Sequence, residues 1–114
     1  MDLDIRESGS VCTLKLKGRL VAGEPISQLK SAITDALSTG HAFLIFDLEE
    51  TPFVDSTGIG ALVESLRTTA KAGGNVKLVN PGLYVTKTLK MVCVLDLFEI
   101  FNNVDEAVAA SSAS

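Results

Sequence analysis

The sequence predicts a single α/β domain, with a mixed β-sheet that opens in an antiparallel N-terminal hairpin and about four helices. The chain of 114 residues has a single-domain length. Apolar residues alternate at a period of two near the N-terminus, and later segments switch between strand-like apolar runs and helical spacing. Strands that alternate with helices need right-handed crossovers between parallel neighbours, so we expect the helices to pack on the sheet.

The first two strands are predicted to form the hairpin. Apolar and polar residues alternate over residues 3–5 and 12–17, on either side of the turn-forming Ser8-Gly9-Ser10. Helical spacing begins at Pro25, a residue suited to the first turn, and Gly40 is placed to end the helix. The apolar positions of this helix are Ile26, Leu29, Ile33, Ala36 and Leu37.

The rest of the chain repeats the strand–helix pattern. Residues 42–48 form an apolar run without alternation, as expected of a central strand covered on both faces. A second helix follows the loop 49–54 and ends at Gly73-Gly74, with Ile59, Leu62, Val63, Leu66 and Ala70 as its inward positions. The remaining predicted elements are a strand at 75–80, a helix at 83–92, a strand at 98–101 and a helix at 105–110. We place the domain at residues 1–110 and expect a flexible tail at 111–114.

Composition argues against several function classes. The formal net charge is −4, and the chain has no basic run and few aromatic residues, so nucleic acid is not an expected ligand. Cys12 and Cys93 stand far apart in apolar surroundings, which indicates reduced core thiols rather than a metal or redox site. We expect no cofactor. The N-terminus lacks the features of a signal peptide, and the apolar run 42–46 is far short of the ~18 residues of a membrane span. These features predict a cytoplasmic protein without direct membrane insertion.

The segment Val54–Gly60, VDSTGIG, stands between the end of a predicted strand and the start of a predicted helix. Open α/β sheets place functional groups at such positions. The free N–H groups and the dipole of a helix start favour negative charge, so a phosphate formed there would be accepted. Ser56 is either the helix N-cap or one residue from it, and Gly58 and Gly60 are expected to leave the backbone uncovered for a second protein.

A purely structural interpretation treats the segment as a helix start, because Ser and Thr are favoured caps. It does not account for two glycines in one helical turn, each of which costs up to ~1 kcal/mol relative to alanine. An enzyme lacks support, since the first Gly of GxSxG and the whole GxxxxGK[ST] pattern are absent. The sole imidazole, His41, precedes the predicted central strand, at the end away from Ser56. We expect no catalytic residues, so a partner would have to supply the chemistry at Ser56.

Residues 46–80 and 85–108 resemble the STAS domain, specifically the bacterial anti-sigma factor antagonists. The likeness begins near Val11, and the DS[ST]G-[LI]-G segment is its most specific part. In that family an anti-sigma factor that is also a serine kinase phosphorylates the serine after the aspartate, which here is Ser56, with Thr57 as the second candidate. The resemblance implies that the unmodified protein binds the anti-sigma factor/serine kinase and so releases a sigma factor. It also implies that a PP2C-type phosphatase returns the phosphorylated protein to its unmodified form.

The partner surface is expected beside this motif, on the outward side of the second helix. Residues there are small near the motif and polar farther along, through Ser65 and Thr68, which suits protein docking better than a small-molecule pocket. The predicted contact residues are Asp55, Ser56, Thr57, Gly58, Gly60, Ala61 and Glu64.

The chain departs from the family pattern at one place. The family often has Gly-Glu-Leu-Asp after its second strand, whereas this chain has Gly18-Arg19-Leu20-Val21. The missing acid bears on the type of partner and leaves a second function open, a non-switching STAS accessory subunit of a transporter or scaffold complex. A serine hydrolase is a third hypothesis, which labelling of Ser56 by a fluorophosphonate probe would support.

Overall fold

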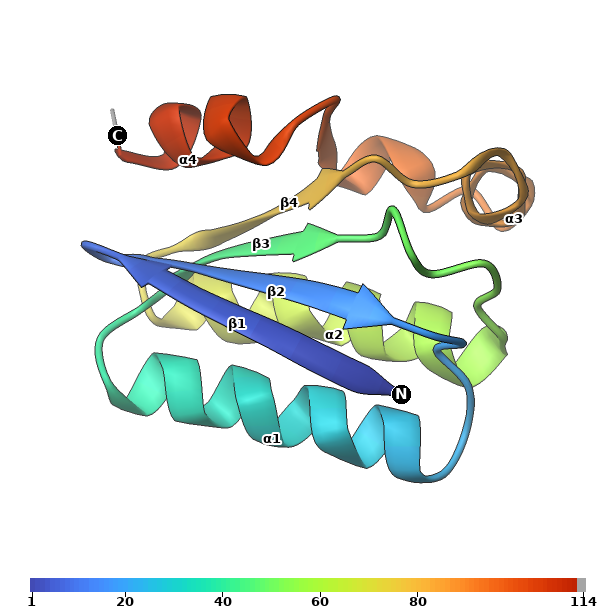
Figure 1. Cartoon of the computed structure of the whole chain (residues 1–114), viewed down its shortest axis with the longest axis horizontal. Coiled ribbons are helices and arrows are strands. Elements are labelled where there is room, and N and C mark those ends of the chain that lie inside the picture. Colours follow the sequence, from blue (N-terminus) through green and yellow to red (C-terminus); the bar gives the residue numbers. More distant parts are fainter. Residues whose placement is uncertain (113–114) are drawn as a thin grey trace.

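The computed structural model describes residues 1–112, which fold into one five-stranded mixed sheet with helices on both faces. The strands are β1 (Asp2–Ser8), β2 (Val11–Lys17), β3 (Phe43–Asp47), β4 (Asn75–Val79) and β5 (Glu99–Phe101). The helices are α1 (Glu24–Ser38), α2 (Ser56–Lys71), α3 (Leu83–Met91) and α4 (Val104–Ser112), with a short 3-10 helix at Leu95–Leu97. The strand order is β1-β2-β3-β4-β5; β1 is antiparallel to β2 and the other neighbours are parallel (Figure 1). The predicted α/β fold with its N-terminal hairpin is confirmed.

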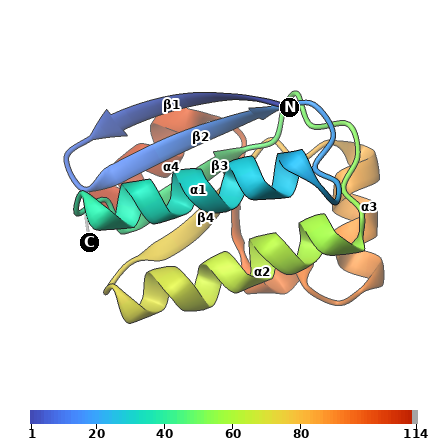
Figure 2. The same ribbon diagram turned by 90° about the horizontal axis from the view of Figure 1, so that it is seen from below.

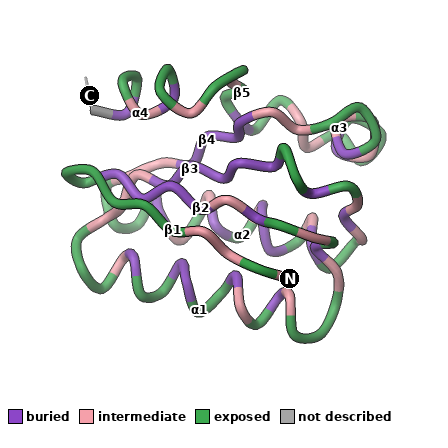
Figure 3. Tube along the Cα trace, viewed as in Figure 1, coloured by how far each residue is buried: buried purple, intermediate pink, exposed green. Residues whose placement is uncertain are grey.

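Two hydrophobic clusters hold the layers together. The larger one lies between the sheet and the helices α1 and α2, and the smaller one lies under α4 (Figures 1 and 2). β3 contributes to both, because Leu44 and Phe46 point into the larger cluster and Ile45 into the smaller. The buried course of β3 and β4 is visible in Figure 3. The prediction of a central strand covered on both faces is therefore confirmed.

The buried face of α2 agrees with the predicted one at Ile59, Leu62, Val63 and Leu66, which belong to the larger cluster or pack against it. The two faces differ at three other positions. Ala61 and Ser65, expected to face outward, are only 6% and 2% exposed, whereas Ala70, expected to face inward, is exposed. The reason is that α2 packs against α1 as well as against β4, so its buried arc is turned toward its neighbouring helix. Small side chains such as Ala61 allow that close approach. The sequence pattern therefore predicted four of the five inward positions of α2 and missed the part of its buried face formed by Ala61 and Ser65.

The C-terminal helix is longer than predicted. α4 continues to Ser112 rather than ending at Ala110, and Ser111 is buried, with its Oγ donating a hydrogen bond to the Ala107 carbonyl at 2.9 Å. Ser111 therefore belongs to the packed domain and not to the predicted 111–114 tail. The last two residues of that tail, 113–114, lie outside the described residues.

The two cysteines occupy different environments. Cys12 is buried as predicted, and burial raises the pKa of its thiol to about 11, with a smaller contribution from the charge of Glu7. The prediction that Cys93 is a core thiol was wrong, because this residue is exposed directly after α3 with a φ of 61°. It occupies the left-handed position that commonly ends a helix. None of the helices formed by residues 1–112 is long and apolar enough to cross a membrane.

Candidate functional site

The loop before α2 is held in place by the segment that follows β2. Leu20 and Val54 form an isolated parallel bridge, in which the Leu20 N–H donates to the Phe53 carbonyl at 3.0 Å and the Asp55 N–H donates to the Leu20 carbonyl at 3.2 Å. The hydroxyl of Thr51 donates to the Leu16 carbonyl at 2.7 Å in a buried contact. The sheet is thus extended past the end of β3, and the residues that open α2 are positioned by Leu20, in the segment that follows β2.

Asp55 is the N-cap of α2. Its Oδ1 accepts a hydrogen bond from the Gly58 N–H at 2.8 Å, and its Oδ2 accepts one from the Ala22 N–H at 2.9 Å. These two bonds, the Ala22 bond first, hold the pKa of the Asp55 carboxyl below its ordinary value, with a smaller contribution from the nearby charge of Arg19. The cap is therefore an ionised carboxylate that also ties α2 to the loop before α1.

Ser56 is the first residue of α2 and is exposed to solvent. Of the two positions left open by the sequence, N-cap or one residue beyond it, the structure has the second. Among residues 1–112 no hydrogen bond to the Ser56 hydroxyl is found. Thr57 is exposed as well. Both hydroxyls are accessible at the positive end of the helix dipole, where an added phosphate would be stabilised by typically 0.3–1 kcal/mol.

The glycines of the motif have different environments. Gly58 is buried, and a Cβ atom on it would lie 2.4 Å from the Leu20 carbonyl oxygen and 2.7 Å from Cγ1 of Val54. Gly60 is exposed, with open space where its Cβ would lie. The prediction that Gly58 is exposed was therefore wrong. The absence of a side chain at Gly58 allows the first turn of α2 to pack closely against Leu20 and Val54. Ala61 is likewise buried, so its side chain is not available to a partner.

The exposed remainder of the predicted surface consists of Ser56, Thr57, Gly60 and Glu64, with Asp55 partly exposed. Glu64 forms an ion pair with Arg67 one turn later on α2. Such an exposed pair contributes little to stability, so Glu64 can exchange partners at small cost. The exposed surface next to Ser56 is therefore formed mainly by small residues and carries negative charge at Asp55 and Glu64.

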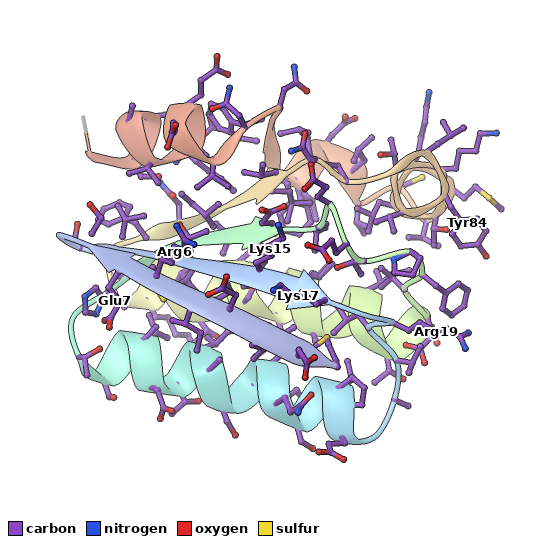
Figure 4. The ribbon with its side chains drawn as sticks, viewed as in Figure 1. Arg6, Glu7, Lys15, Lys17, Arg19 and Tyr84 are labelled. Carbon is purple, nitrogen blue, oxygen red and sulfur yellow. The ribbon has the colours of Figure 1, made fainter. Side chains whose placement is uncertain are left out.

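The structure adds three residues that were not among the predicted contact residues, Arg19, Phe53 and Tyr84. The Arg19 guanidinium lies over the Phe53 ring, 4.7 Å from its centroid, and the Phe53 and Tyr84 rings are 5.6 Å apart. Arg19 and Tyr84 project at the same end of the molecule (Figure 4), the end that also carries the first turn of α2 (Figure 1). The sequence signal was the Arg19 departure itself, but nothing in the spacing placed Tyr84 beside it. Arg19, Phe53 and Tyr84 thus place a cationic and aromatic group of side chains at the end of the molecule that carries Ser56.

In the described part of the chain, Ser56 has no histidine beside it. His41 lies just before β3, at the opposite end of that strand from α2, as predicted. Its Nε2 is 2.9 Å from Oε2 of Glu7, and its Nδ1 is 2.9 Å from Oγ1 of Thr39. Within residues 1–112, no group of three or more His, Cys, Asp or Glu side chains could hold a metal ion.

The family model of the STAS domain matches residues 2–107, and the chain therefore belongs to the STAS domain family. The chain matches none of the curated proteins with which it was compared. It is similar in fold to SpoIIAA, an anti-sigma factor antagonist in its unphosphorylated form: the TM-score is 0.86 and the identity 20%, over 99% of this chain and 98% of that one.

Other solved structures share the fold. TM1081 from Thermotoga maritima, described as an anti-sigma factor antagonist, has a TM-score of 0.87 at 22% identity, over 96% of this chain and 94% of that one. A sulfate transporter family protein from Wolinella succinogenes has a TM-score of 0.78 at 20% identity, over 91% of this chain and 86% of that one. At these identities the similarity establishes the fold, which proteins of both kinds share.

Proposed function

We propose that this protein is an anti-sigma factor antagonist, a cytoplasmic binding module that is switched by phosphorylation of Ser56. The observation that carries the proposal is the free, exposed Ser56 hydroxyl directly after the Asp55 cap, on a STAS fold. Unmodified, the protein binds an anti-sigma factor/serine kinase and releases a sigma factor. The kinase phosphorylates Ser56, and a PP2C-type phosphatase removes the phosphate.

The physical basis of the switch is the charge that phosphorylation adds. A phosphoserine brings about −1.5 to −2 charges at neutral pH, beside the ionised Asp55. Within the protein the N-terminus of α2 tolerates this charge, because its free N–H groups face it. In an interface the same charge has to lose water against a partner surface that already meets Asp55, and like-charge contacts of this kind cost several kcal/mol. Binding changes while the fold is kept.

The similarity to SpoIIAA supports the proposal, since structures of that protein exist in both unphosphorylated and phosphorylated forms. The test is to incubate the purified chain with ATP and the anti-sigma kinases of its own organism and to measure the intact mass. We expect a gain of one phosphoryl group in the wild type and none in Ser56→Ala. A gain that Ser56→Ala keeps and Thr57→Ala loses would assign the acceptor to Thr57 instead. No gain with any of these kinases would contradict the proposed switch.

A second candidate function is that of a non-switching STAS accessory subunit of a transporter or scaffold complex. Two observations favour it, the fold shared with the Wolinella succinogenes transporter family protein and the exposed side chains of Leu83 and Tyr84 at the start of α3. Co-purification from the native organism separates the two functions. Stable recovery with a membrane complex, without phosphorylation of Ser56, would favour the accessory subunit.

A further inference from the structure

One edge of the sheet carries a strand whose outer side is unpaired. Every residue of β1 pairs with β2, from Asp2 opposite Lys17 to Ser8 opposite Val11. In the described part of the chain no strand pairs with the other side of β1. Figure 2 shows β1 along the rim of the molecule, beyond α1. A seven-residue edge of this kind presents backbone groups that a further strand can bond.

The hydrogen bonds of β2 identify the β1 residues that face outward. The carbonyl oxygens of Ser10 and Leu16 accept bonds from the Phe43 N–H at 3.3 Å and the Thr51 hydroxyl at 2.7 Å, both on the β3 side. Even-numbered residues of β2 therefore face β3, and odd-numbered ones face β1, because bonding direction alternates along a strand. Odd residues of β2 pair with even residues of β1. The backbone N–H and C=O groups on the free edge thus belong to Leu3, Ile5 and Glu7.

We propose that two copies of this chain associate through β1, antiparallel and with Ile5 opposite Ile5, to form one continuous sheet. A two-fold axis through such a pair places one residue opposite itself and makes every other contact occur twice. With Ile5 at the centre, Asp4 of each copy lies opposite Arg6 of the other. Leu3 lies opposite Glu7, so the outward-facing backbone groups oppose one another, as hydrogen-bonded pairs require.

Charge and bonding direction select this register. Centring the pair on Asp4 brings two carboxylates together, and centring it on Arg6 brings two guanidinium groups together; like charges directly opposite are destabilising. A shift that places the axis between two residues pairs odd with even positions and leaves the outward N–H and C=O groups unmatched. The Ile5 register alone, among these, pairs opposite charges and keeps the hydrogen bonds.

The edge is self-complementary in its side chains as well. Asp4 and Arg6 lie on one face of β1 and carry opposite charges. A second copy of β1, running antiparallel, therefore presents an arginine opposite Asp4 and an aspartate opposite Arg6. Ile5, on the α1 face, is 50% exposed in the single chain. Contact of two Ile5 side chains across the axis removes apolar surface from water. This inference does not depend on phosphorylation of Ser56.

Sedimentation equilibrium of the full chain, from micromolar to millimolar concentration, tests the proposal. We expect a reversible dimer. Arg6→Asp replaces two attractive contacts by two repulsive ones and should weaken the dimer roughly tenfold or more. Adding Asp4→Arg to Arg6→Asp exchanges the charges and should restore most of the affinity. Lys87→Asp, an equal charge change at an exposed position of α3, should leave the dimer unchanged. Melting temperatures show whether each variant is folded.

Amide hydrogen exchange provides a second test, because a general change in stability would not protect alternate amides of β1. The amides of Leu3, Ile5 and Glu7 should become protected as the concentration rises, while those of Asp4 and Arg6, already bonded to β2, should not change. A monomer at all concentrations would overturn the proposal, as would a dimer that Arg6→Asp leaves intact. Failure of the charge exchange to restore the dimer, or protection confined to another surface such as α3, would overturn it too.

Discussion

The Asp55 carboxylate accepts a hydrogen bond from the Ala22 backbone N–H at 2.9 Å, across 33 residues of chain. The same side chain caps α2 through the Gly58 N–H. One residue therefore fixes both the start of α2 and its position relative to the loop before α1. Capping does not depend on Ser56, whose hydroxyl is left for other chemistry.

Replacement of Ser56 by alanine should leave the fold intact. Ser56 is exposed and is not the cap, so Ser56→Ala should change the free energy of unfolding by no more than about 0.5 kcal/mol. Asp55→Ala, which removes the cap and the Ala22 contact, should lower the melting temperature clearly. Thermal unfolding of the two variants provides the comparison. A large loss of stability in Ser56→Ala would identify Ser56 as a structural residue.

The two glycines should respond in opposite ways to alanine. Gly58→Ala forces a methyl group against the Leu20 carbonyl, where a rigid backbone cannot yield, and should destabilise the protein by roughly 1–3 kcal/mol. Gly60→Ala adds a methyl group in open space within a helix and should stabilise by up to ~1 kcal/mol. Urea denaturation of both variants measures the difference. Equal effects would mean that the close contact at Gly58 is not rigid.

The Asp55 cap predicts a pH-dependent stability difference. Because the folded-state pKa lies below the ordinary 3.8, the contribution of Asp55 is present above that pH and is lost as the pH falls through the folded-state value. Asp55→Asn does not titrate. Its amide has one acceptor oxygen, so it can accept the hydrogen bond from the Gly58 N–H but cannot accept the bonds from both Gly58 and Ala22 as the carboxylate does. Its melting temperature should lie below the wild type at neutral pH, and the gap should narrow below pH 3.8. A gap that stays constant into strong acid would contradict this account.

Affinity for the proposed anti-sigma partner should fall in the order unmodified, Ser56→Asp, phosphorylated Ser56. Together with Asp55, the substitution gives two negative charges and phosphorylation gives nearly three, and the penalty of placing them in an interface grows with the charge. Titration of the three forms against one partner at fixed salt measures the order. Tighter binding of the phosphorylated form would show that phosphate recruits the partner.

Gly60→Glu should weaken partner binding without harming the monomer. The added side chain projects from an exposed position of α2 beside the motif and blocks close approach, while replacement of a helical glycine favours the helix. Gly60→Ala is the matched control and should bind nearly as well as the wild type. Calorimetric titration measures both variants. Unchanged affinity in Gly60→Glu would place the interface elsewhere.

The fold was predictable because its signals are local and agree with one another. Alternation marks the hairpin, and the uninterrupted run around Phe46 marks the buried central strand. The site was predictable only in part. Ser56 was found from its sequence neighbours, but the burial of Gly58 and Ala61 depends on Leu20 and on α1, which are distant in the sequence. The helical spacing of apolar residues predicts one buried face, but it does not show that α2 packs against both β4 and α1.

The contact between Gly58 and the Leu20 carbonyl also bears on how copies of this protein diverge after gene duplication. The requirement for glycine lies at a buried position, whereas Thr57, Gly60 and Glu64 are exposed. Substitutions at exposed positions usually change the free energy of unfolding by no more than about 0.5 kcal/mol. We therefore expect that a duplicate can change these exposed residues one at a time and keep its fold. With the proposed binding function, this route would let paralogous copies acquire separate partners without first rebuilding the loop that presents Ser56.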